Sequence, residues 1–147
     1  MRDIEEVAVE ELYAIRMDVL RRDTPSDNVR FDHDADAETR HLAVRDDTGT
    51  VIAASTWTPR LFPDDPGEPA MQLRGMAVRK EHRRLGLGAA MIAAGVAAAR
   101  SPGFRLVWAN ARDSALDFYV ANGFAVVGEG FRTTDTDLPH HRIVKRV

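Results

Sequence analysis

The stretch that decides the fold of this chain is Leu73-Arg74-Gly75-Met76-Ala77-Val78-Arg79-Lys80-Glu81-His82-Arg83-Arg84-Leu85-Gly86-Leu87-Gly88. A short apolar run leads into a cationic stretch and then into the spacing Arg83-x-x-Gly86-x-Gly88, and an alanine-rich segment with helical spacing follows directly. This order predicts a strand, a basic loop, a glycine turn and a helix. Glycines let the backbone approach a ligand closely, and free N–H groups at a helix start suit a phosphate or pyrophosphate. The stretch therefore predicts an anion-binding loop.

Two motifs resemble those of a known superfamily. Arg83-x-x-Gly86-x-Gly88 after the strand is similar to the acyl-CoA-binding motif of the GCN5-related N-acetyltransferases, and residues 110–124 resemble their second signature. The resemblance implies an α/β fold with a mixed, mainly antiparallel sheet, in which a splayed parallel strand pair is flanked by helices. It also implies acetyl-CoA as cosubstrate and direct attack by a primary amine in a ternary complex. One departure is Arg84, which stands where a glycine is common in the family.

The resemblance also implies where the cosubstrate binds. The pantetheine arm would lie between the splayed strands, bound by the N–H groups of Met76 and Val78, which the splay and a bulge at Gly75 would expose. The alternative for these two residues is core packing. The expected cofactor-binding residues are Met76, Ala77, Val78, Arg83, Arg84, Leu85, Gly86, Leu87, Gly88, Ala89, Asn110, Ala115, Phe118 and Tyr119.

A second group of candidates follows the next strand. Ala115, Phe118 and Tyr119 are spaced by three and four residues and so share one face of a helix. In the family, the tyrosine of a Phe-Tyr-x-x-x-Gly-Phe pattern protonates the CoA thiolate, and residues 118–124 match that pattern. Core packing is the alternative role for Tyr119. Asn110, expected at the end of a strand, either pairs with a ligand amide or caps the following helix.

The motifs specify the CoA-binding residues but do not specify the proton acceptor or the residues that contact the acceptor substrate. The central strand carries no glutamate, so we take His140, expected in a loop before the last strand, as the candidate base. A solvated loop histidine is the alternative. Arg74 is unusual in an apolar strand, and it either pairs with an acid or binds a substrate carboxylate. The segment Asp32-His33-Asp34 only superficially suggests metal ligands, and we expect no metal.

Charge is distributed unevenly along the 147 residues, although the formal net charge is only −3. Residues 1–72 hold 17 acidic and 8 basic side chains, whereas residues 73–147 hold 6 and 12. A polyanionic ligand therefore suits the second half, and an acidic acceptor side favours a cationic small molecule or a peptide amine. We expect neither nucleic acid nor a membrane as partner, with a homodimer as one option.

Length and composition predict one domain over residues 1–147, and the resemblance implies that it is an acetyltransferase domain. The chain has no cysteine, so covalent catalysis through a thiol is excluded. No signal-peptide pattern is present at residues 1–6, and we expect a cytoplasmic protein. Two other functions compete: an acyl-CoA-binding module without catalysis, and a nucleotide-binding protein that uses the glycine turn alone. The second lacks the acidic ribose partner of a dinucleotide site.

Apolar periodicity and turn residues predict the remaining elements. Strands are expected at residues 2–9, 39–45, 50–58, 72–78, 104–109, 124–130 and 142–147, and helices at 10–22, 87–100 and 112–122.

Overall fold

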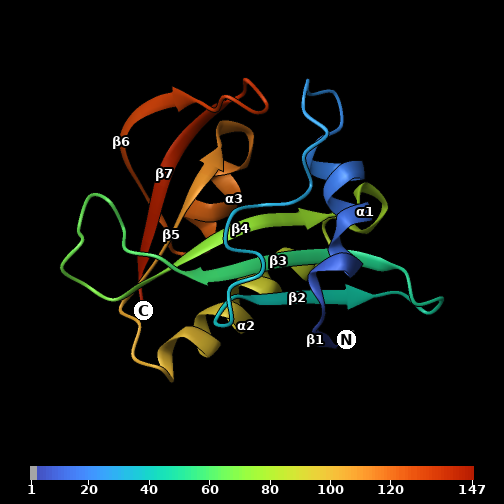
Figure 1. Cartoon of the computed structure of the whole chain (residues 1–147), viewed down its shortest axis with the longest axis horizontal. Coiled ribbons are helices and arrows are strands. Elements are labelled where there is room, and N and C mark those ends of the chain that lie inside the picture. The colour runs from blue at the N-terminus through green and yellow to red at the C-terminus, as the bar shows by residue number, and fades with distance from the viewer. Residues whose placement is uncertain (1–2) are drawn as a thin grey trace.

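The structure, a computed structural model, describes residues 3–147 and contains one seven-stranded sheet (Figure 1). The strands are β1 (Ile4–Glu6), β2 (Arg40–Arg45), β3 (Val51–Pro59), β4 (Ala70–Val78), β5 (Leu106–Arg112), β6 (Ala125–Arg132) and β7 (Pro139–Arg146). Their order in the sheet is β1-β2-β3-β4-β5-β7-β6, and β4 with β5 is the parallel pair. This mixed, mainly antiparallel α/β sheet confirms the expected fold class.

Helical segments lie between the strands. The first combines a 3-10 turn η1 (Val9–Leu12), a short α1 (Tyr13–Ile15) and a π turn η2 (Arg16–Leu20). The others are η3 (Lys80–His82), α2 (Leu87–Arg100), η4 (Asp113–Ala115) and α3 (Leu116–Ala121). Among the described residues, no helix has the length and apolar character needed to cross a membrane.

The two faces of the sheet are covered by different elements, because strand side chains alternate between faces. Helix α2 covers one face, where Ile92 and Val96 pack with Met71 and Leu73 of β4. The helical segment around α1 and the chain that follows it cover the opposite face (Figure 1). Each face thus has its own apolar core.

Helix α2 approaches the sheet very closely. A Cβ atom at Gly95 would lie 1.9 Å from Cζ2 of the buried Trp57, so the ring occupies the space that any larger residue would need. This contact agrees with the expectation that the small side chains of residues 87–100 let the helix pack near the sheet. The bounds of α2, Leu87–Arg100, match the predicted helix.

Strands β4 and β5 separate soon after they begin to pair. Their parallel register covers Ala70–Gln72 opposite Leu106–Trp108, yet β4 continues to Val78 and β5 to Arg112. The partners of β4 beyond Gln72 lie only on β3, where Thr56 opposes Arg74 and Ala54 opposes Ala77. Two residues of β4, Gly75 and Met76, therefore face the single Ser55, which defines a β-bulge. The structure contains both the splay and the bulge at Gly75.

Two predicted boundaries were wrong in ways that matter for function. Strand β5 extends to Arg112 instead of ending at Ala109, and β7 begins at Pro139 instead of Arg142. The cause is mutual pairing, since the register runs from Leu106 opposite Arg146 to Arg112 opposite His140. Polar residues have weak β propensity, so we expected these positions to form loops. Pairing between β5 and β7 extended both strands through them.

Candidate functional site

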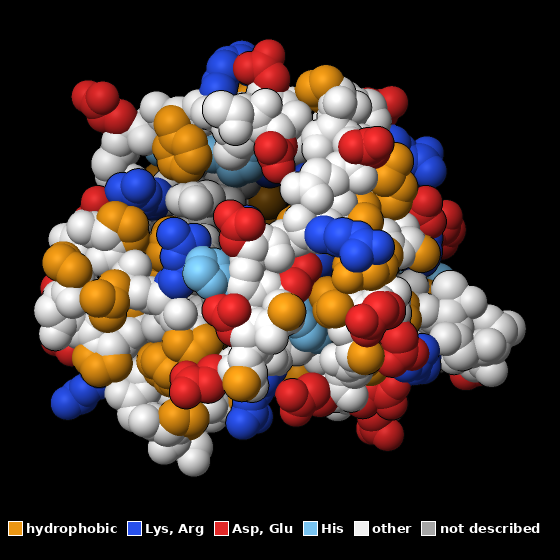
Figure 2. Space-filling model, in the orientation of Figure 1, with side chains coloured by type: hydrophobic (Ala, Val, Ile, Leu, Met, Phe, Trp, Pro, Cys, Tyr) orange, Lys and Arg blue, Asp and Glu red, His pale blue; other side chains and the backbone are white. Residues whose placement is uncertain are grey.

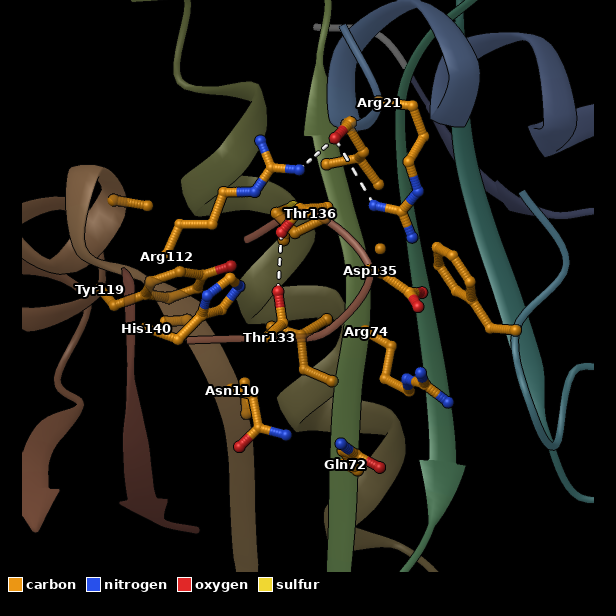
Figure 3. Close-up of a pocket in the computed structure, with 18 of the residues that line it drawn as sticks. Arg21, Gln72, Arg74, Asn110, Arg112, Tyr119, Thr133, Asp135, Thr136 and His140 are labelled. Carbon is orange, nitrogen blue, oxygen red and sulfur yellow. Dashed lines mark hydrogen bonds between the residues drawn. The ribbon is translucent and has the colours of Figure 1, made fainter. Parts of the chain in front are cut away.

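A cavity of about 350 Å³ opens where β4 and β5 diverge (Figure 3). The space-filling view shows a hollow on this face of the molecule, in the region of the diverging strands (Figure 2). Residues from both strands, from the segment after α1, from α3 and from the β6–β7 loop line it: Leu20, Arg21, Phe31, Gln72, Leu73, Arg74, Gly75, Met76, Ala109, Asn110, Ala111, Arg112, Ala115, Tyr119, Thr133, Thr134, Asp135, Thr136 and His140.

The splayed strands present polar side chains toward this cavity. Because neighbours on a strand alternate, Gln72 and Arg74 of β4 point away from the α2 side, on which Leu73 packs. Asn110 and Arg112 occupy the equivalent positions of β5 (Figure 3). Asn110 lies within the strand, opposite Arg142, and Arg112 precedes the next helical turn, so the helix-capping alternative for Asn110 is excluded. Its amide is instead exposed to the gap.

Backbone N–H groups of β4 also face the gap. Arg79 N–H donates to Ile52 O of β3, and hydrogen-bonded positions alternate along an antiparallel pair. The N–H groups of Val78 and Met76 are therefore directed away from β3, toward the side from which β5 has departed. The side chains of both residues pack against the core beside Leu87 and Met91. Core packing and a free N–H group are thus compatible at these positions, and their binding role stays a prediction.

Tyr119 is placed at the inner end of the cavity. Its ring is 7% exposed and packs edge-on against Phe118 and Phe124, with centroid separations of 5.1 and 5.5 Å. Its hydroxyl end points into the cavity beside the ring of His140 (Figure 3). No residue of 3–147 forms a hydrogen bond with that hydroxyl. Burial raises the pKa of Tyr119 to about 12, so the phenol keeps its proton at any physiological pH.

His140 lies on β7, opposite Arg112, and not in a loop as predicted. It is buried and stacked on Phe131, with 5.8 Å between the ring centroids. Its Nδ1 is 2.8 Å from Leu138 O, and a carbonyl only accepts, so Nδ1 carries the proton and Nε2 keeps the basic lone pair. Burial is the main cause that lowers the pKa of His140, so the imidazole is neutral at pH 7. The alternative of a solvated histidine is therefore excluded.

The predicted anion-binding loop runs from Arg79 to the start of α2. Arg84 and Gly86 adopt positive φ angles of 65° and 80°, a conformation that glycine tolerates best. The first hydrogen bond of α2 is donated by Ala90 N–H to Gly86 O, which leaves the N–H groups of residues 87–89 outside the helical ladder. Arg79 is already paired with Asp18 at 2.8 Å, whereas Arg83 and Arg84 are exposed.

Gly88 has a structural role that the motif does not reveal. A Cβ atom there would lie 2.8 Å from Cζ of Phe118, so α2 and α3 meet at this glycine. Gly86 has open space around the position of a Cβ atom. Of the two motif glycines, Gly86 is therefore the one whose replacement tests ligand approach without disturbing packing.

A buried polar cluster closes one side of the cavity. Arg16 is fully buried and forms a two-pronged bond with Asp34, at 2.7 and 3.1 Å. Its guanidinium also stacks on Phe31, 4.0 Å from the ring centroid. Phe31 in turn fills the space over the bulge, since a Cβ atom at Gly75 would lie 2.9 Å from its Cε2. This cluster fixes the segment between α1 and β2 against the open strand pair.

These features match a known family. A model described as the acetyltransferase (GNAT) family matches residues 4–124. The chain belongs to the acetyltransferase (GNAT) family. It is 29% identical over 131 residues to the uncharacterized N-acetyltransferase YitI of Bacillus subtilis, covering 89% of this chain and 87% of that protein.

Solved structures of other proteins share the fold. An acyl-CoA N-acyltransferase from Pseudomonas aeruginosa superposes with a TM-score of 0.76 at 19% identity, covering 97% of this chain and 99% of the other. Escherichia coli ElaA gives a TM-score of 0.74 at 17% identity, with coverage of 97% and 99%. Family membership makes this protein an acyl-CoA-dependent N-acetyltransferase, and CoA binds to GNAT proteins as the acyl carrier.

The GNAT motifs located only part of the cavity. The structure brings Met76, Asn110, Ala115, Tyr119 and His140 to one cavity and places the glycine loop at the start of α2 nearby. Sequence reasoning missed several lining residues that come from segments without a motif: Arg21, Phe31, Gln72, Arg112, Thr133, Thr134, Asp135 and Thr136. Arg112 offered the clearest signal, as a charged residue that follows the predicted strand 104–109 by three positions.

Proposed function

We propose that this GNAT protein transfers the acetyl group of acetyl-CoA to a primary amine by direct attack, with His140 as base and Tyr119 as acid. The observation that carries the proposal is that both side chains line the cavity at the splayed strands, with the proton on His140 Nδ1 and the lone pair on Nε2. The proposal rests on those positions and on the family.

The roles follow from what each group can do. An amine is largely protonated near pH 7, so Nε2 of His140 would accept the proton that the amine loses. A new N–C bond forms as the C–S bond breaks, and the carbonyl oxygen gains charge that the N–H group of Met76 or Val78 would stabilise. Tyr119 would give its proton to the departing sulfur. After the N–C bond forms, the nitrogen loses its remaining extra proton to solvent, and solvent returns a proton to the Tyr119 oxygen, whose raised pKa favours the phenol.

The binding of CoA depends on groups outside the cavity. Its pyrophosphate would lie on the N–H groups at the start of α2, with positive charge from Arg83 and Arg84. The pantetheine arm would then pass Gly88 and Asn110 to reach Met76. Leu85, Leu87, Ala77 and Ala89 complete the expected contacts with CoA, as neighbours of these groups.

Replacing Gly86 with Val tests the pyrophosphate site. We expect CoA affinity to fall at least tenfold, about 1.4 kcal/mol, because a branched side chain disfavours φ of 80° and blocks the loop backbone. Isothermal titration calorimetry with CoA measures this. Gly103→Val is the matched control, because Gly103 also has a positive φ, 96°, and open space but lies at the other end of α2. Equal affinity in the two variants would refute the site.

Replacing His140 with Gln tests the base. We expect kcat/KM at pH 7.5 to fall by about 10² to 10⁴-fold, the range for a lost general base. In the unaltered enzyme, the rate should fall as pH drops through a pKa below 6.5, because protonated His140 cannot accept a proton. That acidic limb should vanish in the variant. His141→Gln is the control, because its ring pairs with Asp113 at 2.7 Å and does not line the cavity. An unchanged pH profile in His140→Gln would assign the proton to another group or to water.

A further inference from the structure

The buried and half-buried arginines of residues 3–147 fall into two groups. One group has acidic partners within 4.0 Å: Arg16 with Asp34, Arg45 with Glu5 and Glu11, Arg79 with Asp18 and Arg142 with Asp64. The other group consists of Arg21, Arg74 and Arg112, which form no ion pair with a described residue. All three line the cavity. The half-buried arginines among residues 3–147 that form no ion pair therefore all lie in the lining of this cavity.

The hydrogen bonds of these three side chains within residues 3–147 go to no carboxylate. Arg74 donates to Asp32 O at 3.0 Å, and Arg21 donates to Asn28 O at 2.7 Å. Arg112 and Arg21 both donate to Leu20 O, which draws the two guanidinium groups together (Figure 3). Each acceptor is a neutral backbone carbonyl. A guanidinium has five N–H donors in a fixed fork, so donors remain for a ligand.

The electrostatic surroundings are also positive. Burial is the largest cause that lowers the pKa of each of the three guanidinium groups, and neighbouring arginines lower it further. Asp135 is the carboxylate in the cavity lining, and it acts on Arg21. Asp32 and Asp34 act on Arg74, but Asp34 is already bonded to Arg16. The lining thus holds three partly desolvated arginines and one carboxylate, and this excess of positive charge is costly in the free protein and favours an anionic ligand.

The charges that line the cavity differ from those that the overall charge distribution led us to expect. The acidic first half predicted a cationic acceptor, but many of its carboxylates are bonded elsewhere. Asp18, Asp34, Asp64 and Glu68 pair with arginines, and Asp36 pairs with His33. The acceptor cavity itself therefore has the opposite sign to the segment that covers it.

We propose that the acceptor amine also carries an anionic group, a carboxylate or a phosphate, and that Arg74, Arg112 and Arg21 bind this group. The inference rests on the proposed transferase function and specifies its substrate class. Planar guanidinium groups bind carboxylate and phosphate oxygens through paired N–H donors, which also orients the bound molecule. The anion would lie among the arginines and the amine would lie toward His140, as in an amino acid or an amino phosphate.

Matched acceptors test the inference directly. Each amino acid is compared with its amide, which keeps the same side chain and amine but lacks the carboxylate, and phosphoethanolamine is compared with ethanolamine. We expect kcat/KM, measured by CoA thiol release, to be at least tenfold higher for one anionic class than for its neutral partner. The amino acid and phosphate arms show which anion the cavity prefers. A preference for amides, ethanolamine or polyamines would overturn the inference and leave the transferase function standing.

Variants connect the preference to the arginines. Arg74→Gln and Arg112→Gln should reduce the ratio of anionic to neutral turnover to near one, mainly through KM, and Arg74→Lys should keep part of it because the charge remains. Arg100→Gln is the control, since Arg100 is exposed at the end of α2 and away from the cavity. An unchanged ratio in both Gln variants would overturn the assignment of these residues.

A binding measurement separates failure of the inference from failure of the proposed function. Thermal shifts are measured with CoA present, comparing N-acetyl amino acids with their amides and N-acetylphosphoethanolamine with N-acetylethanolamine. If no amine releases thiol, the transferase proposal fails, but stabilisation by an anionic member alone still supports an anion site. Equal shifts within every pair would overturn it.

Discussion

Tyr119→Phe is expected to lower kcat by about 10 to 10³-fold while CoA affinity stays within a factor of two. The hydroxyl has no hydrogen-bond partner among residues 3–147, so its removal leaves no group of the protein unpaired. The ring contacts with Phe118 and Phe124 persist in the variant. What is lost is the proton for the departing sulfur. Steady-state kinetics with calorimetric titration of CoA measures both quantities.

The outcome distinguishes the acid from a packing residue. If Tyr119 only fills the core, then the Tyr119→Phe enzyme should have an unchanged kcat, because Phe preserves the packing. If CoA affinity and kcat fall together, the ring or its hydroxyl positions CoA instead of protonating it. A raised pKa of about 12 adds a further condition: no basic limb in the rate below about pH 10 should depend on this residue.

Arg16→Ala is expected to lower the free energy of unfolding by about 3–5 kcal/mol, the usual cost of removing one partner of a buried ion pair. Asp34 would remain nearly buried without its cation. Removing Arg16 also breaks a hydrogen-bond network. In this network Arg16 Nη2 donates to Thr56 Oγ1 at 2.8 Å, and the Thr56 hydroxyl lies 2.9 Å from His41 Nδ1. His41 Nε2 then donates to Asp34 O at 3.0 Å.

Urea unfolding measures this stability change. Arg146→Ala is the control, because its long, exposed pair with Glu68 at 3.7 Å is worth about 0–1 kcal/mol. Activity of Arg16→Ala should also fall at urea concentrations below its unfolding transition. The reason is that Arg16 and Asp34 hold Phe31 over the bulge. A loss similar to that of the control would mean that the segment between α1 and β2 is anchored by its other contacts.

Local rules carried most of the fold prediction. The helix Leu87–Arg100 and the hairpin of β2 and β3 were predicted closely, because helical spacing and turn residues act over a few positions. The Phe118–Phe124 pattern located Tyr119 in the same way, since its parts are adjacent in the chain. The boundaries that failed near the cavity are the end of β5 at Arg112 and the start of β7 at Pro139, where cross-strand pairing extended the strands past Asn110 and His140.

The sequence by itself therefore determined the central strand, the glycine turn, the helix behind them and the family to which they belong, since each depends on neighbours in the chain. The tertiary structure alone decided that β4 and β5 part after Gln72, that His140 lies on a strand opposite Arg112, and that Arg21, Arg74 and Arg112 meet without a carboxylate partner. Those features join residues up to about ninety positions apart, such as Leu20 and Arg112. Electrostatic interaction depends on distance in space and on burial, so a count of charges along the chain did not show that three arginines and one aspartate line this cavity.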